Sequence, residues 1–500
     1  MKKYIGAALA AISALTLSSC EGLLNTNPTS SVSDQSIFTT VSGAQGALNG
    51  CYYLLNFYDS GGRADCEGYI AQLMTFSVDG QDIIVNGGWY GYDYNMWGHQ
   101  RGDIFKAPAL WIYYYDIINN LNSVITYTPN IEGGDEDAKD NILGQAYAMR
   151  GWAYFNLAQL FEHTYVLAKE KNMPGVPIYT EPTSDQTEGK PRGTIDETYN
   201  QILSDLNTAE TLLDGKTRTA KNHFDQSVVR GILAHVYLVM NNWAKAEEYA
   251  SLARAGYPLT TNEQWGQGFN DESVDSWMWC LLEDQENRLM GEGAYGPFAL
   301  WANGIVRDGD EKWSFNCFYL NDKFADLFNE SDIRGQQIHY DADLGLHKSD
   351  KFYDDQELCG DFPYMRSDEL LLVEAEAKAR QGKTSESLSL LNELQGMRGA
   401  TLTTTTNQES LVEAILLERR KELYGEGYDW YDLIRCQKPM LREGNHSSFG
   451  GNTPLPARSW RYVYQIPTNE ILNNPNINSD TYPTAGYGQN LFGDRSLVLE

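Results

Sequence analysis

This 500-residue chain has no apolar run long enough to cross a bilayer as a helix. Basic residues are also scarce: 38 Lys and Arg stand against 68 Asp and Glu, which gives a formal net charge of −30. Such an excess of negative charge disfavours nucleic acids and anionic lipid surfaces as partners. The composition therefore predicts a globular body that is attached to a membrane, if at all, by other means than a spanning helix.

The six cysteines after Cys20 form no CxxC pair and no regular framework, which disfavours a zinc site or a disulfide scaffold. Buried free thiols are expected, and a single bridge between Cys51 and Cys66 is the open alternative. Catalytic signatures are missing too: there is no HExxH, Walker loop, GxGxxG or GxSxG, and the seven histidines are dispersed. We therefore expect a protein that is not an enzyme.

Two acidic loops are the candidate metal sites. Asp341–Asp343 and Asp350–Asp355 are dense in oxygen ligands, but neither has the Gly and terminal Glu of an EF-hand loop. Solvated acidic loops are the expected structure, and a structural calcium ion is the alternative. We predict no other cofactor.

The N-terminus reads as an export signal. Lys2 and Lys3 precede an apolar run, Tyr4–Leu17, which is too short to span a bilayer. The run ends in Leu17-Ser18-Ser19-Cys20, which resembles a bacterial lipobox, whose cysteine is acylated and becomes the first mature residue. We therefore predict a signal peptide over residues 1–19, lipidation of Cys20, an anchored polar leader over residues 20–34 and a single domain over residues 35–500.

Helical periodicity dominates the rest of the chain, with apolar residues recurring three and four positions apart. The segments are Ile104–Tyr127, Ala138–Val166, Ile195–Leu213, Ser227–Met240, Trp243–Arg254, Asp368–Gln381, Ser385–Met397 and Leu411–Leu423. Long Gly- and aromatic-rich stretches lie between them, chiefly Asn86–Asp103 and Gln264–Asp322. The pattern predicts a mainly α-helical scaffold whose long loop insertions form the functional surface.

One pair of predicted helices has the spacing of a tetratricopeptide repeat. Small and aromatic residues occupy its positions, at Leu233, Ala234, Tyr237, Trp243, Ala246, Ala250, Ala253 and Pro258. Looser versions occur at Tyr147–Tyr154, around Gly151, and at Leu371–Leu394, hinged on Gly382. Because such units cannot bury their apolar faces singly, we expect them to stack into one scaffold.

Taken together, these motifs resemble the SusD/RagB family along nearly the whole chain. Its patterns are matched by Leu23-Leu24 and Pro28, by Ala146–Tyr154 with Pro174 and Pro177, and by Tyr364–Leu372, Glu418–Leu423, Glu426–Arg435, Ile466-Pro467 and Asn474-Pro475. The chain departs at Gly486–Asn490, where the residues of the family's terminal element stand in another order.

The resemblance implies a SusD-like fold with four tetratricopeptide-like units. It also implies an outer-membrane, lipid-anchored protein that faces the cell exterior and binds oligosaccharides. Its expected partner is a TonB-dependent transporter of the SusC type, which takes up the captured glycan.

The densest charged cluster comprises Glu418, Arg419, Glu422, Glu426, Asp432 and Arg435. A catalytic carboxylate would need an apolar setting that raises its pKa, whereas interleaved arginines keep carboxylates ionised. We therefore interpret the cluster as a structural network of ion pairs.

The tract Asn86–Asp103 combines five glycines with Trp89, Tyr90, Tyr92, Tyr94 and Trp97 and almost no aliphatic residue. Aromatic faces desolvate the C–H face of a sugar, and neighbouring polar side chains can bind its hydroxyls. Because the family's ligand site draws on this region, Trp89, Tyr90 and Trp97 are the leading candidates. Asp79, Asn95 and Arg101 are the polar candidates, and the alternative is that the rings cover the helical core.

A second aromatic tract supplies Tyr295, Trp301 and Trp313 as further candidates. Trp277 and Trp279, in contrast, are expected in the core.

Four functions compete. The leading hypothesis is a non-catalytic oligosaccharide receptor, and the same receptor loaded with peptide, as in the RagB branch, is the alternative. A surface glycoside hydrolase and a protein-binding scaffold are the others.

Overall fold

Helices form at the segments that the periodicity predicts from Ile104 onward, and two further helices, Val41–Phe57 and Gly68–Asp79, precede them. The computed structural model describes residues 35–57, 64–87, 90–95, 102, 105–283, 296–301, 306–307, 310–311, 316–354, 358, 360–449 and 454–477. The predicted signal peptide, Cys20, the leader and Gly486–Asn490 lie outside these residues. Helix accounts for 57% and strand for 7%, so the predicted mainly α fold is confirmed.

The first layer consists of α2 (Val41–Phe57), α3 (Gly68–Asp79), α5 (Lys106–Tyr127) and α6 (Glu136–Phe161). The side chain of Asp135 caps α6 by accepting a hydrogen bond from the Asp137 backbone N–H at 3.0 Å. α6 packs closely against α8 (Ile195–Leu212), because Gly151 leaves room there for Leu206. A Cβ on Gly151 would lie 2.9 Å from Leu206 Cγ. Gly151, the small residue in one of the two looser predicted repeats, thus allows α6 and α8 to pack closely.

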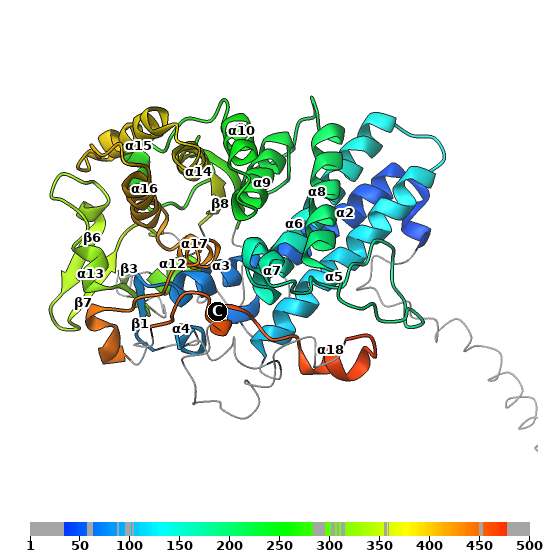
Figure 1. Ribbon diagram of the computed structural model, residues 1–500. Helices are drawn as coiled ribbons and strands as arrows, with labels where there is room; N and C mark the ends of the chain where they lie inside the picture. The colour runs from blue at the N-terminus through cyan, green and yellow to red at the C-terminus, as the bar shows by residue number, and fades with distance from the viewer. Residues whose placement is uncertain are drawn as a thin grey trace, which may run out of the picture.

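The predicted tetratricopeptide pair is confirmed as α9 (Gln226–Val239) and α10 (Trp243–Ala253). Ala246, Ala250 and Ala253 are fully buried, and Tyr237 stacks on Tyr249 with ring centroids 5.5 Å apart. α14 (Ser367–Arg380), α15 (Thr384–Arg398) and α16 (Gln408–Leu423) extend the array. Figure 1 shows α8 to α10 and α14 to α16 following one another along one side of the molecule.

Short strands complete the scaffold. β1 (Ile83–Val85), β5 (Phe318–Leu320), β7 (Leu346–Ser349) and β6 (Ile338–Asp341) form an antiparallel sheet in that order. β2 (Trp277–Leu281) pairs with β8 (Phe362–Arg366), and β3 (Val306–Arg307) with β4 (Asp310–Glu311). The remaining helices are α4 (Gly91–Tyr94), α7 (Tyr165–Glu170), α11 (Asn262–Trp265), α12 (Pro297–Trp301), α13 (Asp322–Ala325), α17 (Tyr428–Arg435) and α18 (Thr468–Asn473). Short 3-10 turns occur at Gln35–Thr39, Ala64–Cys66, Thr128–Asn130, Gly335–Gln337, Gly444–Phe449 and Trp460–Tyr462.

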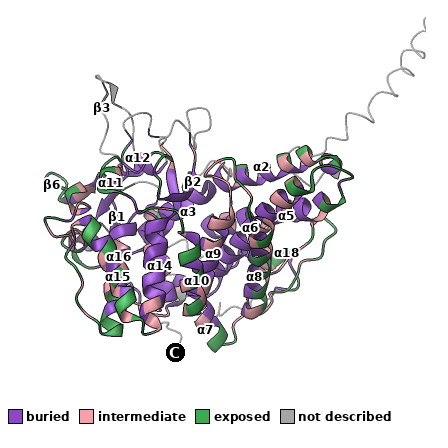
Figure 2. Cartoon of the chain, turned by 90° about the horizontal axis from the view of Figure 1, so that it is seen from above, coloured by how far each residue is buried: buried purple, intermediate pink, exposed green. Residues whose placement is uncertain are grey.

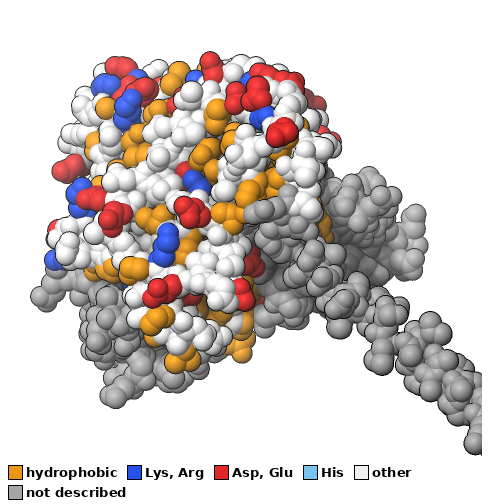
Figure 3. All heavy atoms as spheres, turned by 90° about the vertical axis from the view of Figure 1, so that its right-hand side faces the viewer, with side chains coloured by type: hydrophobic (Ala, Val, Ile, Leu, Met, Phe, Trp, Pro, Cys, Tyr) orange, Lys and Arg blue, Asp and Glu red, His pale blue; other side chains and the backbone are white. Residues whose placement is uncertain are grey.

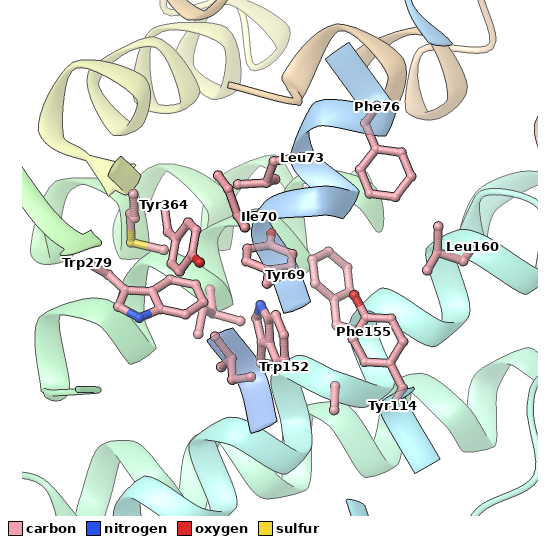
Figure 4. Close-up of a cluster of buried hydrophobic side chains, with 14 of the residues drawn as sticks. Tyr69, Ile70, Leu73, Phe76, Tyr114, Trp152, Phe155, Leu160, Trp279 and Tyr364 are labelled. Carbon is pink, nitrogen blue, oxygen red and sulfur yellow. The ribbon is translucent and has the colours of Figure 1, made fainter. Parts of the chain in front are cut away.

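The main core joins the N-terminal helices to the later elements, and a second apolar cluster lies between α14, α15 and α16. Buried residues line the inner faces of α3, α6 and α14, while exposed residues lie at the ends and outer faces of helices such as α8 and α15 (Figure 2). At the centre, rings from α3, α6, β2 and β8 meet edge to face (Figure 4). Tyr69 lies 4.9 Å from Trp152 and 5.0 Å from Tyr364, and Trp279 lies 4.8 Å from Tyr364. Trp279 is therefore a core residue, as predicted, and so is Trp277, which is fully buried.

The described cysteines are free thiols. Cys51 and Cys66 are both buried and unbridged, so the alternative of a disulfide between them is wrong. Burial raises the pKa of the Cys51 thiol to about 12, which leaves it protonated and unreactive at neutral pH.

The charged cluster on α16 is centred on Glu422, whose side chain is fully buried. Its carboxylate accepts hydrogen bonds from Arg366 and Arg398, both at 2.9 Å on Oε1, and from Arg334 at 2.9 Å on Oε2. Burial alone would raise the pKa of Glu422, but the three guanidinium groups outweigh burial and hold the pKa well below its usual range. The group is thus an ionised structural anchor.

Other members of the cluster are paired in the same way. Arg419 binds Glu369 at 2.9 Å and Asp432 at 2.8 Å, and Arg435 binds Glu376 at 2.7 Å. These pairs fasten α16 and α17 to α14, which confirms the structural interpretation of the cluster.

Replacing Glu422 by Gln should lower the free energy of unfolding by about 3–5 kcal/mol, because three buried guanidinium groups lose their shared counter-charge. Urea unfolding at neutral pH measures the change. The matched control is Glu409→Gln, an exposed position in the first turn of the same helix, which should change stability by less than about 0.5 kcal/mol. Equal midpoints for the two variants would show that the network does not stabilise the fold.

Candidate ligand-binding site

The two predicted aromatic tracts adjoin a pair of neighbouring strands: the first follows β1, and the second precedes β5. The backbone N–H of Asn86, at the end of β1, donates to the carbonyl of Cys317 at 2.8 Å. Cys317 in turn donates its N–H to Leu300 O in α12 at 3.1 Å, and β1 pairs with β5. The ends of both tracts that the structure describes are therefore fastened side by side at β5, although more than 200 residues separate them in the sequence.

One buried ring joins the two tracts. Phe318 on β5 meets Tyr90 at a centroid distance of 5.3 Å and Trp301 at 5.7 Å, both nearly perpendicular. Tyr90 is 3% exposed and Trp301 is 1% exposed. These rings therefore form the apolar base on which the two tracts rest.

A buried ion pair fixes the short helix α4, which belongs to the first tract. Lys106 Nζ, in the first turn of α5, lies 3.3 Å from Asp93 Oδ2, and both side chains are fully buried. Lys106 also donates to Thr75 Oγ1 at 3.0 Å and to the carbonyl of Asp65. Burial raises the pKa of Asp93 to about 7 although Lys106 opposes the shift. The pair ties α4 to both α3 and α5.

Tyr94, the residue after Asp93, gives α4 a second set of contacts. Its hydroxyl is hydrogen-bonded to His446 Nδ1 at 2.8 Å, and the Arg442 guanidinium lies 4.6 Å from its ring centroid. Burial, together with Arg442, lowers the pKa of His446 to about 4, so the ring is neutral at physiological pH. Tyr94 is thus a structural contact between α4 and the C-terminal region.

The predicted ligand residues divide by burial. Asp79, Tyr90, Tyr94 and Trp301 are all at most 3% exposed, so a ligand at the surface does not reach them in this structure. Tyr92 is 45% exposed, with one ring edge against Phe105, and half-buried Asn95 donates its side-chain amide to Gly91 O at 2.7 Å. For Tyr90 and Tyr94 this burial agrees with the alternative that rings of the first tract cover the helical core.

Five other candidates lie outside the described residues and stay predictions: Trp89, Trp97, Arg101, Tyr295 and Trp313. Sequence reasoning missed the supporting residues Phe318 and Lys106. A lysine at the start of the strongly apolar segment after Phe105 is a usable signal, because an unpaired charge there would be costly.

In each acidic loop, one carboxylate forms an ion pair with a side chain of the protein. Asp341 binds Lys348 at 2.6 Å, and Asp350 binds His339 at 2.7 Å. Within the described ranges, no three His, Cys, Asp or Glu side chains gather as metal ligands would. In the same part of the chain, no helix is both long and apolar enough to cross a membrane.

Comparisons with known proteins identify the fold and the family. A family model described as "Starch-binding associating with outer membrane" matches residues 72–238, and one described as "SusD family" matches residues 345–487. A SusD-like protein of Formosa agariphila is 26% identical, over 86% of this chain and 90% of that protein.

Solved structures of SusD-like proteins have the same fold as this chain. A SusD-like carbohydrate binding protein from Bacteroides vulgatus shares 27% identity and a TM-score of 0.78 over 88% of this chain and 98% of that chain. A SusD superfamily protein from Bacteroides thetaiotaomicron, 23% identical, has the same fold, with a TM-score of 0.74 over 88% of this chain and 99% of that one.

The chain belongs to the SusD/RagB family. Members of the SusD family are non-catalytic binding proteins, and the model that matches residues 72–238 describes association with the outer membrane. The chain is therefore a binding protein and not an enzyme, as its lack of catalytic motifs predicts.

The division by burial has a measurable consequence. Tyr90→Ala should lower the free energy of unfolding by about 3–5 kcal/mol, because it removes a ring packed on Phe318 and leaves a cavity. Tyr92→Ala, two residues along, should cost less than about 1 kcal/mol, because its ring is half exposed. Chemical denaturation of both variants measures the difference. A Tyr92 variant that is as unstable as the Tyr90 variant would contradict the assignment of Tyr92 to the surface.

Proposed function

We propose that the chain is a cell-surface glycan receptor, anchored in the outer membrane through a lipid on Cys20. It captures oligosaccharides at the loops that flank β5 and delivers them to a SusC-like TonB-dependent transporter. The observation that carries the proposal is the convergence of two ring-rich tracts on one strand, through Asn86, Cys317 and Phe318.

The chemistry of these tracts suits a sugar. Each is rich in Trp and Tyr, whose faces desolvate the C–H surface of a pyranose, and each carries polar residues that can pair with hydroxyls. A base of buried rings and the Asp93–Lys106 pair hold the start of the first tract in place, which reduces the entropy lost on binding. Tyr92 is the described ring that we assign to ligand contact, together with Trp89, Trp97, Tyr295 and Trp313 from sequence.

Relatives support the ligand class and the location. The Bacteroides vulgatus relative is named as a carbohydrate binding protein, and the matching family model as starch-binding and associated with the outer membrane. We propose residues 1–19 as the signal peptide, residues 20–34 as the leader and residues 35–500 as one SusD-like domain.

Removing one loop ring should weaken glycan binding without unfolding the protein. We expect micromolar to millimolar affinity for a matching oligosaccharide, and Trp89→Ala or Trp97→Ala should raise the dissociation constant about thirty-fold, the effect of losing about 2 kcal/mol. Calorimetric titration measures the affinity, and thermal melting measures the stability, which should stay near that of the parent protein.

The matched control for these variants is Tyr53→Ala, because Tyr53 is 60% exposed on α2. It should bind like the parent protein. Normal affinity with early melting of the Trp89 and Trp97 variants would mean that these rings cover the core. Binding of extended peptides in preference to oligosaccharides would instead support the RagB-like alternative.

Cys20→Ala should abolish the incorporation of labelled fatty acid, because the acyl acceptor is lost, and should leave the protein unprocessed or released. Radiolabelling and membrane fractionation measure the two effects. Cys51→Ala, which removes a buried thiol, is the matched control and should be labelled normally. Full labelling of the Cys20 variant would reject the lipid anchor.

A further inference from the structure

A short segment near the C-terminus, Arg442–His446, contacts the elements from which both aromatic tracts leave the scaffold. It runs into the 3-10 turn Gly444–Phe449. The first tract includes α4, which lies next to β1 (Figure 1), and the second tract precedes β5. Side chains of the segment reach both α4 and the residues after β5, although more than 340 residues separate the segment from α4.

Arg442 joins α4 to the end of α3. Its Nε donates to Gly80 O at 3.0 Å and its Nη2 to Val78 O at 2.8 Å, both at the C-terminal end of α3. Its Nη1 donates to the carbonyl of Tyr94, the last residue of α4, and the guanidinium lies 4.6 Å from the Tyr94 ring centroid. Carbonyls at a helix end have no partner within the helix, and an arginine is a usual donor to them.

Arg442 differs from the cations at the surface. On the side of the molecule that Figure 3 shows, Lys and Arg side chains lie at the surface, several of them close to Asp or Glu. Arg442, in contrast, is 6% exposed, and three backbone carbonyls accept hydrogen bonds from it. A buried charge without hydrogen bonds would be costly, so the position of this guanidinium and the position of α4 depend on each other.

His446 provides a second attachment of α4. The side chain is fully buried, with Nε2 2.9 Å from Gln81 O and Nδ1 2.8 Å from the Tyr94 hydroxyl. A carbonyl oxygen only accepts, so Nε2 carries the proton. Because the low pKa of His446 leaves the ring neutral, Nδ1 accepts from the Tyr94 hydroxyl. His446 therefore connects α4 to the residues just before β1 in one defined tautomer.

The same segment is bound to the residues that follow β5. Asn321 donates its side-chain amide to Glu443 O at 2.7 Å and to Asn445 Oδ1 at 3.0 Å. Asn445 donates to Asp322 Oδ1 at 2.8 Å and accepts from the Asp322 N–H at 3.2 Å. Gly444 permits this approach, because its φ is +71° and a Cβ would lie 3.3 Å from Asn321 Nδ2. The segment thus fastens α4 and the end of β5 to each other.

The exposed ring on α4 is the one that these contacts orient. α4 has four residues, and a helix of one turn is not stable by itself, so its position depends on its side-chain contacts. Asp93 and Tyr94 are buried, whereas Tyr92 is 45% exposed, with one ring edge against Phe105. Holding Asp93 and Tyr94 in place therefore directs Tyr92 toward the solvent.

We infer that Arg442 and His446 are positioning residues of the binding site, which hold α4, and with it the ring of Tyr92, in a fixed place relative to β1 and β5. The inference rests on the proposed function, since it takes Tyr92 to contact the glycan. It adds a link to β5 that the Asp93–Lys106 pair does not make, because that pair ties α4 to α3 and α5. A ring that is held in place before the ligand arrives loses less entropy on binding.

Two substitutions at His446 separate its two hydrogen bonds. His446→Gln keeps an amide N–H₂ near the place of Nε2, which can donate to Gln81 O, and removes the acceptor for Tyr94. His446→Asn puts an amide oxygen near the place of Nδ1, which can accept from Tyr94, and gives up the bond to Gln81. Tyr94→Phe removes the Tyr94–His446 bond from the other side. We expect His446→Gln and Tyr94→Phe to behave alike and His446→Asn to stay close to the parent protein.

Hydrogen exchange followed by mass spectrometry measures the attachment of α4 directly. The helix has two backbone bonds to report, from Tyr94 N–H to Tyr90 O at 2.9 Å and from Asn95 N–H to Gly91 O at 3.1 Å. Exchange over residues 90–95 should be at least about tenfold faster in His446→Gln and in Tyr94→Phe, the effect of losing one buried hydrogen bond. Exchange in β1 and in the central helices should stay at the parent rate.

Glycan affinity is the second measurement. Calorimetric titration with neutral hexasaccharides of glucose, xylose, mannose and galactose identifies the one that the parent protein binds most tightly. His446→Gln and Tyr94→Phe should each raise its dissociation constant about three- to tenfold. The double variant should go no further, because both substitutions remove the same bond.

The matched control is Tyr113→Phe. It removes a buried hydroxyl that donates to Leu55 O on α2 at 2.7 Å. It should lower the melting temperature about as much as Tyr94→Phe does, because each removes one buried hydroxyl. Exchange over residues 90–95 and glycan affinity should both stay at the parent values.

The outcomes separate the two proposals. Parent-like exchange over residues 90–95 in His446→Gln and Tyr94→Phe would overturn the positioning role and leave the glycan receptor in place. Faster exchange with unchanged affinity, or an equal loss of affinity in His446→Asn and His446→Gln, would overturn it as well. If no hexasaccharide binds the parent protein, the proposed function fails, and the positioning role fails with it.

Discussion

The fold depends on one buried carboxylate shared by three arginines. Glu422 on α16 binds Arg334 before β6, Arg366 at the end of β8 and Arg398 at the end of α15. Each partner comes from a different segment, so a single side chain fixes the relative positions of two helices, a strand and a loop. Removing any arginine from water is costly, and only complete pairing offsets that cost. The network therefore fixes the C-terminal helices in one arrangement against the central β2–β8 ribbon.

The proposed binding surface is separate from that scaffold. The rings of the central cluster, such as Tyr69 and Trp279, join the N-terminal helices to the β2–β8 ribbon, while the aromatic tracts leave the scaffold at β5. The Asp93–Lys106 pair and the base formed by Phe318 lie between the two regions. Because the buried scaffold provides the stability, residues in the aromatic tracts can vary in sequence without loss of the fold.

Most of the long helices and the tetratricopeptide pair could be predicted, because each depends on neighbours close in sequence, such as Ala246 and Ala250 one turn apart. α2 and α3 were not among the predicted helices, and the arginines that bind Glu422 lie in three distant segments. The burial of Tyr90 and Tyr94 could not be predicted either, since their partners Phe318 and His446 lie more than 200 residues away. The number of aromatic residues in a glycine-rich tract does not indicate which of the rings point into the core and which point to the solvent.

The most direct measurement is a crystal structure of the protein soaked with an oligosaccharide that it binds in solution. We predict sugar density against the loops that flank β5, with a Trp or Tyr face on a sugar ring and the Glu422 network unchanged. Sugar density confined to the surface of the helical repeats, such as α9 and α10, with the loops beside β5 empty, would contradict the assignment of the binding surface.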